Sequence, residues 1–432
     1  MDAAQSTPAK PSIFPILLVN FIGTLGYSIL LPFLVILVTK FEGNELVYGI
    51  LGATYSVFQF VGAPLLGRWS DRIGRRKVLL LSQGGTFLAW ILFLIALLLP
   101  IEQIASVGTV IITLPLAILF LARALDGITG GNVSVANAYL ADISTDETRQ
   151  ANFGRMGAAA HLGFVAGPII AGLLGATALE EIPPVLASML ISFTAILVIA
   201  FRLPESKATL LKKPADPKKS TRKILGQEHK ECHKMKGEEE HGFRKILSLP
   251  GIPFILAFYF LIILAFNFYY VSFPMFAIKT LSWDTLQLGI YFSVFGGVLV
   301  CTETFILARL AKRFSEIKLI PMGFISMVAG FGLFMTGDPV LVYVGAVFLG
   351  LGNSITWPSF LSLVARSAGK KYQGAVQGAA SSMGSLAAII GLITGGFLFS
   401  QMDSWAFAVP AGMMVLLFFL AFRFRSFKFN GE

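Results

Sequence analysis

Long apolar runs separated by short polar turns make up most of this sequence. A helix that crosses a lipid bilayer needs about 20 mostly apolar residues. The runs that satisfy this length lie at residues 13–39, 45–67, 78–99, 111–141, 152–176, 183–201, 251–279, 286–308, 318–336, 339–366, 374–400 and 405–423. The pattern therefore predicts an all-α membrane protein with twelve transmembrane helices.

Residues 202–249 interrupt the apolar pattern. This segment is highly charged, contains proline and shows no sustained periodicity, which is typical of a cytosolic linker. It divides the chain into two groups of six spans. We therefore expect one six-helix bundle over residues 13–201, a second over residues 250–425, and short cytosolic tails at residues 1–12 and 426–432.

The placement of charge predicts how the chain crosses the membrane. Cytoplasmic loops carry an excess of Lys and Arg. If the N-terminus is cytoplasmic, the outer loops contain several acids and only Lys40 and Lys279 as bases, while the inner loops contain nearly all the other bases. We therefore predict a multi-pass protein of the inner (plasma) membrane with both termini in the cytoplasm.

Composition excludes a soluble globular protein. Of the 432 residues, 55% are hydrophobic and only 13% are charged, which is far from the average of soluble domains. The formal net charge of +10 raises the question of nucleic-acid binding. The basic residues are confined to turns between apolar runs, so we expect the lipid bilayer rather than nucleic acid as partner, and a monomeric protein.

The turn after the second run has a distinctive sequence. Residues 67–77 read GRWSDRIGRRK and place five basic residues around Asp71. Arg75 lies four residues after Asp71, within reach of an ion pair. The glycines Gly67 and Gly74 allow helix backbones to approach closely. The whole pattern resembles the loop between the second and third helices of major facilitator superfamily transporters.

This resemblance implies a fold and a mechanism. The superfamily has two six-helix bundles that are parallel repeats about an axis along the membrane normal, with the substrate site between them. In the family this loop latches the two bundles together on the cytoplasmic side during alternating access. The residues that would form the latch are Gly67, Asp71, Arg72, Gly74 and Arg75. The alternative is that the basic residues only anchor the loop in the cytoplasm.

A second motif lies in the fifth predicted span, which contains HLGFVAGPIIAG at residues 161–172. Its spaced glycines permit close helix packing, and its proline removes a backbone hydrogen bond and bends the helix. The stretch resembles the antiporter motif of the same family, and the matching residues are Gly163, Gly167, Pro168 and Gly172. The resemblance favours exchange over symport, whereas a generic small-residue packing face is the alternative.

Two further stretches are similar to the tetracycline-efflux branch of the drug/proton antiporters. They are LARALDGITGGNVSVANAYLAD in the fourth span and QGAVQGAASSMGS at the start of the eleventh. That branch commonly has an acidic residue early in its first helix, where this chain has only Asn20 as a strongly polar group. The resemblance implies secondary active export of a small amphipathic, drug-like molecule in exchange for protons. The alternatives are a metabolite or siderophore exporter, an uncoupled facilitator, or a non-transporting receptor or scaffold.

Three charged residues fall inside the predicted spans: Arg123, Asp126 and Glu303. Each would cost about 2.5–3.5 kcal/mol at the bilayer centre even on the lower insertion scales, so each should face the protein interior or a cavity. Arg123 and Asp126 are three residues apart and can pair. Glu303 has no base three or four residues away. We predict proton coupling through Asp126 with Arg123, or through Glu303; the alternatives are a structural ion pair and a solvated helix end.

Aromatic and amide side chains at helical spacing predict the lining of a central cavity. The predicted lining residues are Asn20, Thr24, Tyr27, Tyr55, Gln59, His161, Asn267, Tyr270, Asn353, Trp357 and Gln377. Aromatic rings with a few amides suit an amphipathic or aromatic small molecule better than a bare ion or a sugar. Each residue could instead serve helix packing.

Other chemistries find no support in the sequence. It contains neither a GxxxxGK[ST] phosphate-binding motif nor a nucleophile–base constellation, so we expect no enzyme, no cofactor and an ion or solute gradient as energy source. The run that contains His229, Cys232, His233 and His241 does not match a closed zinc pattern. We therefore predict no metal site.

Overall fold

The computed structural model describes residues 12–107, 110–130, 132–206, 248, 251–367 and 369–426. Its first half contains α1 Phe14–Lys40, α2 Glu45–Ile73, α3 Arg75–Leu98, β1 Gln103–Val107, β2 Val110–Thr113, α4 Leu114–Thr129, α5 Asn132–Ile143, α6 Asp146–Gly175 and α7 Ile182–Arg202. Its second half contains α10 Ile252–Lys279, α11 Thr285–Cys301, η2 Thr302–Leu307, α12 Ala308–Leu310, α13 Glu316–Phe334, α14 Pro339–Ser367, α15 Gly369–Met402, η3 Asp403–Phe407, α16 Ala408–Ala421 and η4 Phe422–Ser426. Most of the predicted linker and nearly all of both predicted tails lie outside the described residues.

The described chain contains 11 helical stretches that are long and apolar enough to cross a membrane. The last of them, Gly378–Phe424, includes most of the eleventh predicted span and all of the twelfth, so the prediction of twelve transmembrane helices is compatible with the structure. The fourth span, Leu114–Ile143, is divided between α4 and α5, and the eighth, Thr285–Leu310, runs through α11, η2 and α12.

The prediction was wrong at the start of the fourth span, which was expected to be helical from residue 111. Residues 110–113 form β2 instead, which pairs antiparallel with β1. The sequence VIIT is rich in β-branched residues, which favour strands, and Pro115 then occupies one of the first positions of α4. The Thr113 hydroxyl donates to the carbonyl of Phe41 at 3.1 Å and fastens this hairpin to the turn after α1.

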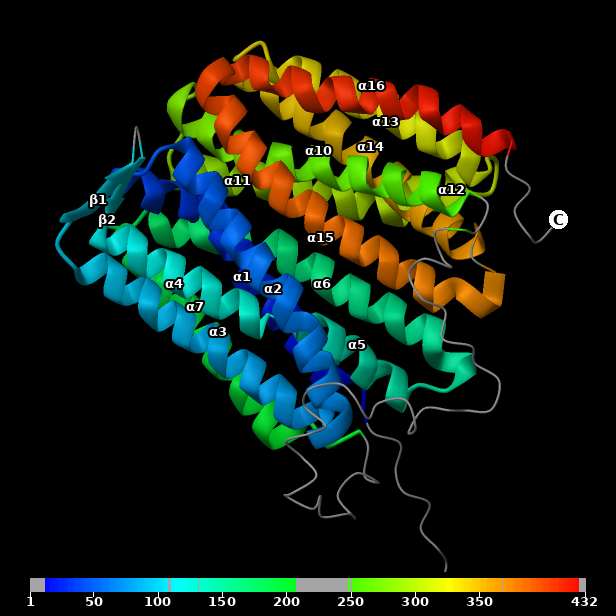
Figure 1. Ribbon diagram of the computed structural model, residues 1–432, viewed down its shortest axis with the longest axis horizontal. Helices are drawn as coiled ribbons and strands as arrows, with labels where there is room; N and C mark the ends of the chain where they lie inside the picture. The colour runs from blue at the N-terminus through cyan, green and yellow to red at the C-terminus, as the bar shows by residue number, and fades with distance from the viewer. Residues whose placement is uncertain are drawn as a thin grey trace, which may run out of the picture.

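Figure 1 shows α1 to α7 gathered in one bundle and α10 to α16 in a second bundle beside it. The hairpin β1–β2 lies at one end of the molecule, which we call the sheet end, and α16 ends toward the opposite end, which we call the terminus end. The main contacts between the bundles are those of α2 with α15 and of α6 with α11, and α1 and α10 make smaller contacts across the interface.

Glycines bring the two bundles into backbone contact near the sheet end. A Cβ atom on Gly289 of α11 would lie 2.5 Å from the carbonyl oxygen of Pro168 on α6. A Cβ atom on Gly49 of α2 would lie 2.5 Å from the carbonyl oxygen of Leu392 on α15. Small residues permit this kind of approach between membrane helices, and any larger side chain at either position would push the bundles apart.

Candidate functional site

A cavity of about 320 Å³ lies between the two bundles, and we call it the central cavity. Both bundles contribute to its walls, since Tyr27 and Tyr55 come from α1 and α2 while Asn267 and Tyr270 come from α10. The rings of Tyr27 and Tyr55 lie 6.2 Å apart between centroids. The predicted lining residues that the structure brings together here are Tyr27, Tyr55, Gln59, Asn267 and Tyr270.

A second cavity of about 280 Å³ lies within the first bundle, and we call it the N-terminal cavity. It shares Tyr27, Tyr55 and Gln59 with the central cavity. Asn20 and Thr24 line this cavity rather than the central one. The side-chain amide of Asn20 donates to the carbonyl of Met156 at 2.9 Å, which ties α1 to α6 beside the cavity. Sequence reasoning expected a single polar chamber and did not separate the two.

The pair formed by Arg123 and Asp126 lies between the two cavities. Arg123 lines the central cavity, while Asp126 lines the N-terminal cavity. Their closest atoms, Nη1 and Oδ2, are 3.5 Å apart, as the spacing of three residues predicts. The Thr86 hydroxyl donates to Oδ1 of Asp126 at 2.9 Å, and the guanidinium carbon of Arg123 lies 4.4 Å from the centroid of the Tyr55 ring.

Arg123 is only 4% exposed. Among the described residues, its Nε and Nη1 atoms have no hydrogen-bond partner. A guanidinium group has five N–H donors, and buried donors are nearly always paired in folded proteins. These unfilled donors are therefore the most unusual polar feature of the two cavities.

The third predicted coupling residue, Glu303, pairs across the bundles. Its Oε2 atom lies 3.3 Å from Nδ1 of His161 on α6, and the side chains are 26% and 51% exposed. Glu303 lies in η2, a π-helical segment, and such segments occur frequently at functional sites. The sequence has no base three or four residues from Glu303, because its partner in the structure comes from the other half of the chain.

The remaining predicted lining residues lie elsewhere. Within the described part of the chain, His161, Asn353 and Trp357 line neither cavity. The Trp357 ring packs instead against Tyr259 with centroids 5.5 Å apart. The side chain of Gln377 lies outside the described residues.

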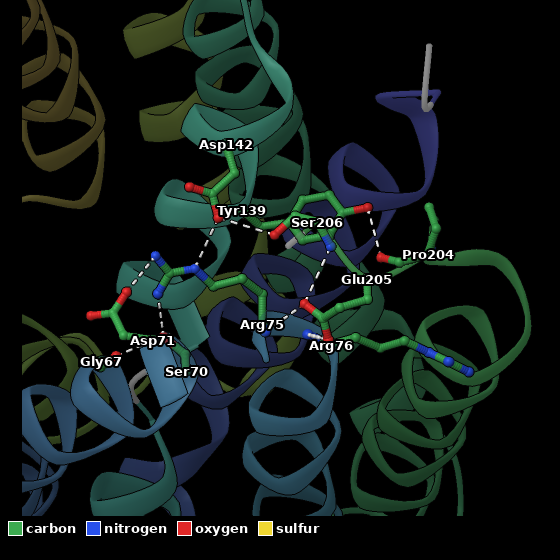
Figure 2. A network of polar contacts seen from close by, with 10 residues as sticks. All are labelled: Gly67, Ser70, Asp71, Arg75, Arg76, Tyr139, Asp142, Pro204, Glu205 and Ser206. Atoms are coloured by element: carbon green, nitrogen blue, oxygen red, sulfur yellow. Dashed lines mark hydrogen bonds and ion pairs between the residues drawn. The ribbon is translucent and has the colours of Figure 1, made fainter. Parts of the chain in front are cut away.

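Figure 2 shows the polar network around the basic turn between α2 and α3. Arg75 is buried at its centre, and its Nη2 atom lies 2.8 Å from Oδ1 of Asp71. Its Nε donates to Oδ2 of Asp142 on α5 at 3.1 Å, and its Nη1 donates to the Ser70 hydroxyl at 2.5 Å. These contacts tie the turn to the end of α5 within the first bundle, and Arg72 is exposed beside them.

Glu205, which sequence reasoning did not single out, completes this network (Figure 2). Its Oε1 accepts the backbone N–H of Arg75 at 2.7 Å, and its Oε2 accepts that of Arg76 at 3.2 Å. These are the first N–H groups of α3, where a carboxylate is favoured by the helix dipole. The Arg76 side chain in turn donates to the carbonyls of Ile199 and Ala200 near the end of α7.

The two glycines of the turn have different roles. Gly74 has a φ of +107°, which other residues rarely adopt, and the Glu205 carboxylate lies against it. The expectation of close packing at Gly67 was wrong for this conformation, because a Cβ atom there would meet nothing within 4 Å. Gly67, near the end of α2, faces open space rather than another helix.

The glycines of the fifth span pack against both bundles. A Cβ atom on Gly163 would lie 2.6 Å from the carbonyl oxygen of Phe21 on α1, and the Ser28 hydroxyl donates to the Gly163 carbonyl at 3.0 Å. Gly167 also packs against α1, next to Ser28. Gly172 lies against Leu286 of α11 in the second bundle. The glycines therefore serve two packing surfaces of α6, one within the first bundle and one between the bundles, rather than a single face.

Ion pairs at the sheet end were not foreseen. Lys279, at the end of α10, pairs with Glu45 at the start of α2 and so connects the two bundles. Lys40 pairs with Glu180 at 2.7 Å and with Glu181 at 2.6 Å. The hydrogen bond and positive charge of Lys40 lower the pKa of the exposed Glu180 carboxyl group. The described residues contain no group of three or more His, Cys, Asp or Glu side chains that could hold a metal ion, and the run from His229 to His241 lies outside them.

Comparison with known proteins gives the family. The family model described as Major Facilitator Superfamily matches residues 16–392 and 304–429. The chain is 30% identical over 411 residues to the class E tetracycline resistance protein of Escherichia coli, covering 93% of this chain and 92% of that protein. It is 25% identical to multidrug resistance protein 2 of Bacillus subtilis (strain 168), covering 95% of each.

A solved structure of the xylose transporter XylE from E. coli, in an inward-open conformation, shares the fold. The TM-score is 0.70 at 17% identity, with 96% of each chain covered. The family is one of transporters and not of enzymes. The helices, the two bundles, the motifs and these comparisons together show that the chain belongs to the Major Facilitator Superfamily.

Proposed function

We propose that the protein exports a small amphipathic, drug-like molecule across the plasma membrane in exchange for protons, by alternating access. The central cavity carries this proposal, because it lies between two bundles and is walled by tyrosines with a few amides. The relatives named as tetracycline and multidrug resistance proteins support the substrate type.

The charge pattern supports cytoplasmic termini, because basic residues are concentrated in the loops on that side. In this orientation the sheet end faces outward. The backbone contacts at Gly49 and Gly289 and the ion pair between Lys279 and Glu45 then close the cavity from outside. The conformation would be inward-facing, and the latch around Asp71 would act in the opposite, outward-facing state.

The proton would be carried by Asp126 with Arg123, or by Glu303. Asp126 is supported by its position on a cavity wall beside a base. The role of Glu303 as proton carrier is supported by its contact with His161 in the other bundle. This contact can form only in a conformation that brings α6 and η2 together. A carboxyl group whose contacts differ between two conformations can bind a proton on one side and release it on the other.

Purified protein in proteoliposomes with an acidic lumen tests the proposal. Proton exchange predicts that a substrate, with tetracycline as the first probe, accumulates in the lumen and that a protonophore abolishes this accumulation. An uncoupled facilitator would only equilibrate the probe. A receptor or scaffold would not move any of a set of drugs, siderophores and metabolites, and that result would contradict the proposal.

A further inference from the structure

We propose that Arg123 is a docking site for an acidic oxygen of the substrate, so that the central cavity takes planar aromatic molecules that carry a carboxylate, enolate or phenolate. This inference rests on the proposed function only in taking the central cavity as the substrate site. It adds the chemical class of the ligand and the residue that recognises it.

The unfilled hydrogen-bond donors of Arg123 are the first observation. The side chain is 4% exposed, and its Nε and Nη1 atoms have no hydrogen-bond partner among the described residues. Buried charges are normally paired and hydrogen-bonded, because the lost hydration must be replaced. The Arg123 side chain also lines the central cavity, so a ligand bound there could supply the acceptor that the described residues do not.

Asp126 does not supply the missing hydrogen-bond acceptor for Arg123. The separation of 3.5 Å between its Oδ2 and Nη1 of Arg123 exceeds the usual N–H···O range of about 2.7–3.2 Å. Its other oxygen already accepts the hydroxyl of Thr86. Asp126 also lines the N-terminal cavity, whereas Arg123 lines the central one, so the two side chains face different spaces.

The sign of the charge gives the ligand class. Among the described residues that line the central cavity, Arg123 is the only charged one. An ammonium ligand would therefore meet a positive charge with no acid on the same wall. A carboxylate can instead accept two parallel N–H bonds from a guanidinium group, the geometry that arginine favours.

Aromatic side chains complete the site. The guanidinium group lies over the ring of Tyr55, which restricts its orientation. Tyr27 stands beside Tyr55, and Tyr270 faces them from the other bundle. Flat tyrosine rings around a fixed cation suit a planar aromatic acid, because ring stacking and charge pairing act on the same ligand.

The site also has a consequence for proton coupling. Asp126 and the ligand acid would both carry negative charge close to one guanidinium group, so protonation of Asp126 would remove a competing charge and strengthen ligand binding. Linkage makes this effect reciprocal. Exchange needs proton and substrate to oppose each other, so an acidic substrate assigns the exchanged proton to Glu303 rather than to Asp126.

Three ligands with one ring system test the site: 9-anthracenecarboxylate, its neutral carboxamide and 9-anthracenemethylammonium. Their dissociation constants are measured by fluorescence titration with the full-length protein in nanodiscs, without any gradient. We expect the carboxylate to bind at least about tenfold more tightly than the carboxamide, with the ammonium weakest. Arg123→Gln should make the dissociation constants of the carboxylate and the carboxamide about equal. Asp126→Asn should tighten carboxylate binding several-fold.

The controls separate the site from general effects. Arg123→Lys keeps the charge and should retain part of the preference, while Arg155→Gln removes an exposed arginine outside the cavity and should leave it unchanged. Equal affinity for the three ligands, preference for the ammonium, or no binding of the carboxylate overturns the proposal. Loss of gradient-driven accumulation in proteoliposomes with carboxylate selectivity intact would refute the proposed transport and leave the acid site standing.

Discussion

Nδ1 of His161 lies 3.3 Å from Oε2 of Glu303, and this contact connects α6 of the first bundle to η2 of the second. In addition to the backbone contacts at the sheet end, it is a point at which the bundles meet through titratable side chains. Its strength depends on protonation and on the distance between the bundles. The pair is therefore placed where a proton could influence the arrangement of the two bundles.

Glu303→Gln is expected to abolish accumulation driven by a pH gradient while leaving substrate counterflow at equal pH measurable. The amide keeps the size of the side chain but cannot carry a proton. Transport by proteoliposomes under both conditions checks this. Glu102→Gln, which removes an exposed acid beside the hairpin, is the control and should behave as wild type. Undiminished gradient dependence in Glu303→Gln would exclude Glu303 as the carrier.

Breaking the pair between Lys279 and Glu45 is expected to open the sheet end. Glu45 is nearly buried, so its loss should shift the balance of conformations by about 1 kcal/mol, the upper end for such pairs. Spin labels at Leu179 and Trp405, in a background with Cys232 and Cys301 replaced by serine, would report the distance between bundles. Glu45→Gln should populate a longer distance.

The charge-swapped double variant of this pair, Glu45→Lys with Lys279→Glu, serves as the control. It should restore the wild-type distance distribution if the attraction between the two charges is what holds the sheet end closed. An unchanged distribution in Glu45→Gln would show that the backbone contacts alone keep it closed.

Gly289→Ala is expected to impair transport, because the new Cβ atom would lie 2.5 Å from the carbonyl oxygen of Pro168 in the other bundle. Overpacking of this kind costs about 1–3 kcal/mol. This cost would destabilise the conformation in which the sheet end is closed. Gly297→Ala on the same helix is a matched control, since a Cβ atom there meets nothing within 4 Å. Equal transport rates in the two variants would contradict the close contact.

Glu205→Ala is expected to lower the thermal stability of the protein in detergent. The substitution removes the acceptor for the first N–H groups of α3, and losing such a cap costs about 1 kcal/mol. Thermal unfolding followed by tryptophan fluorescence measures the shift. Glu205→Gln, which keeps one acceptor oxygen, should fall between wild type and alanine. A melting temperature equal to that of wild type in Glu205→Ala would argue that the cap is replaceable by water.

Several site features could be predicted from local spacing alone. Arg123 and Asp126 are three residues apart on one helix, so helical geometry brings them together. Arg75 follows Asp71 by four and pairs with it as predicted, but α2 ends at Ile73 and α3 begins at Arg75, so a turn rather than one continuous helix forms this pair. Other contacts could not be predicted. Glu303 and His161, like Lys279 and Glu45, come from different bundles, and no local pattern specifies which helices meet.

The residues that line the cavities could also be predicted only in part. Helical periodicity places residues on a shared face but does not say which way that face points in the assembled protein. Tyr55 and Gln59 face the cavities as expected, whereas Trp357 turns toward Tyr259 instead. The rotation of a helix about its axis depends on the shapes of all its neighbours.

Apolar length and helical spacing are local properties of the chain, so the sequence alone predicts the membrane class, the spans apart from the start of the fourth, the family resemblance and the pair of Arg123 with Asp126. Tertiary packing places Arg123 and Asp126 against two separate cavities, brings Glu205 to the first turn of α3 and pairs Lys279 with Glu45 across the bundles. These features depend on how distant helices pack, and packing is a property of the whole chain.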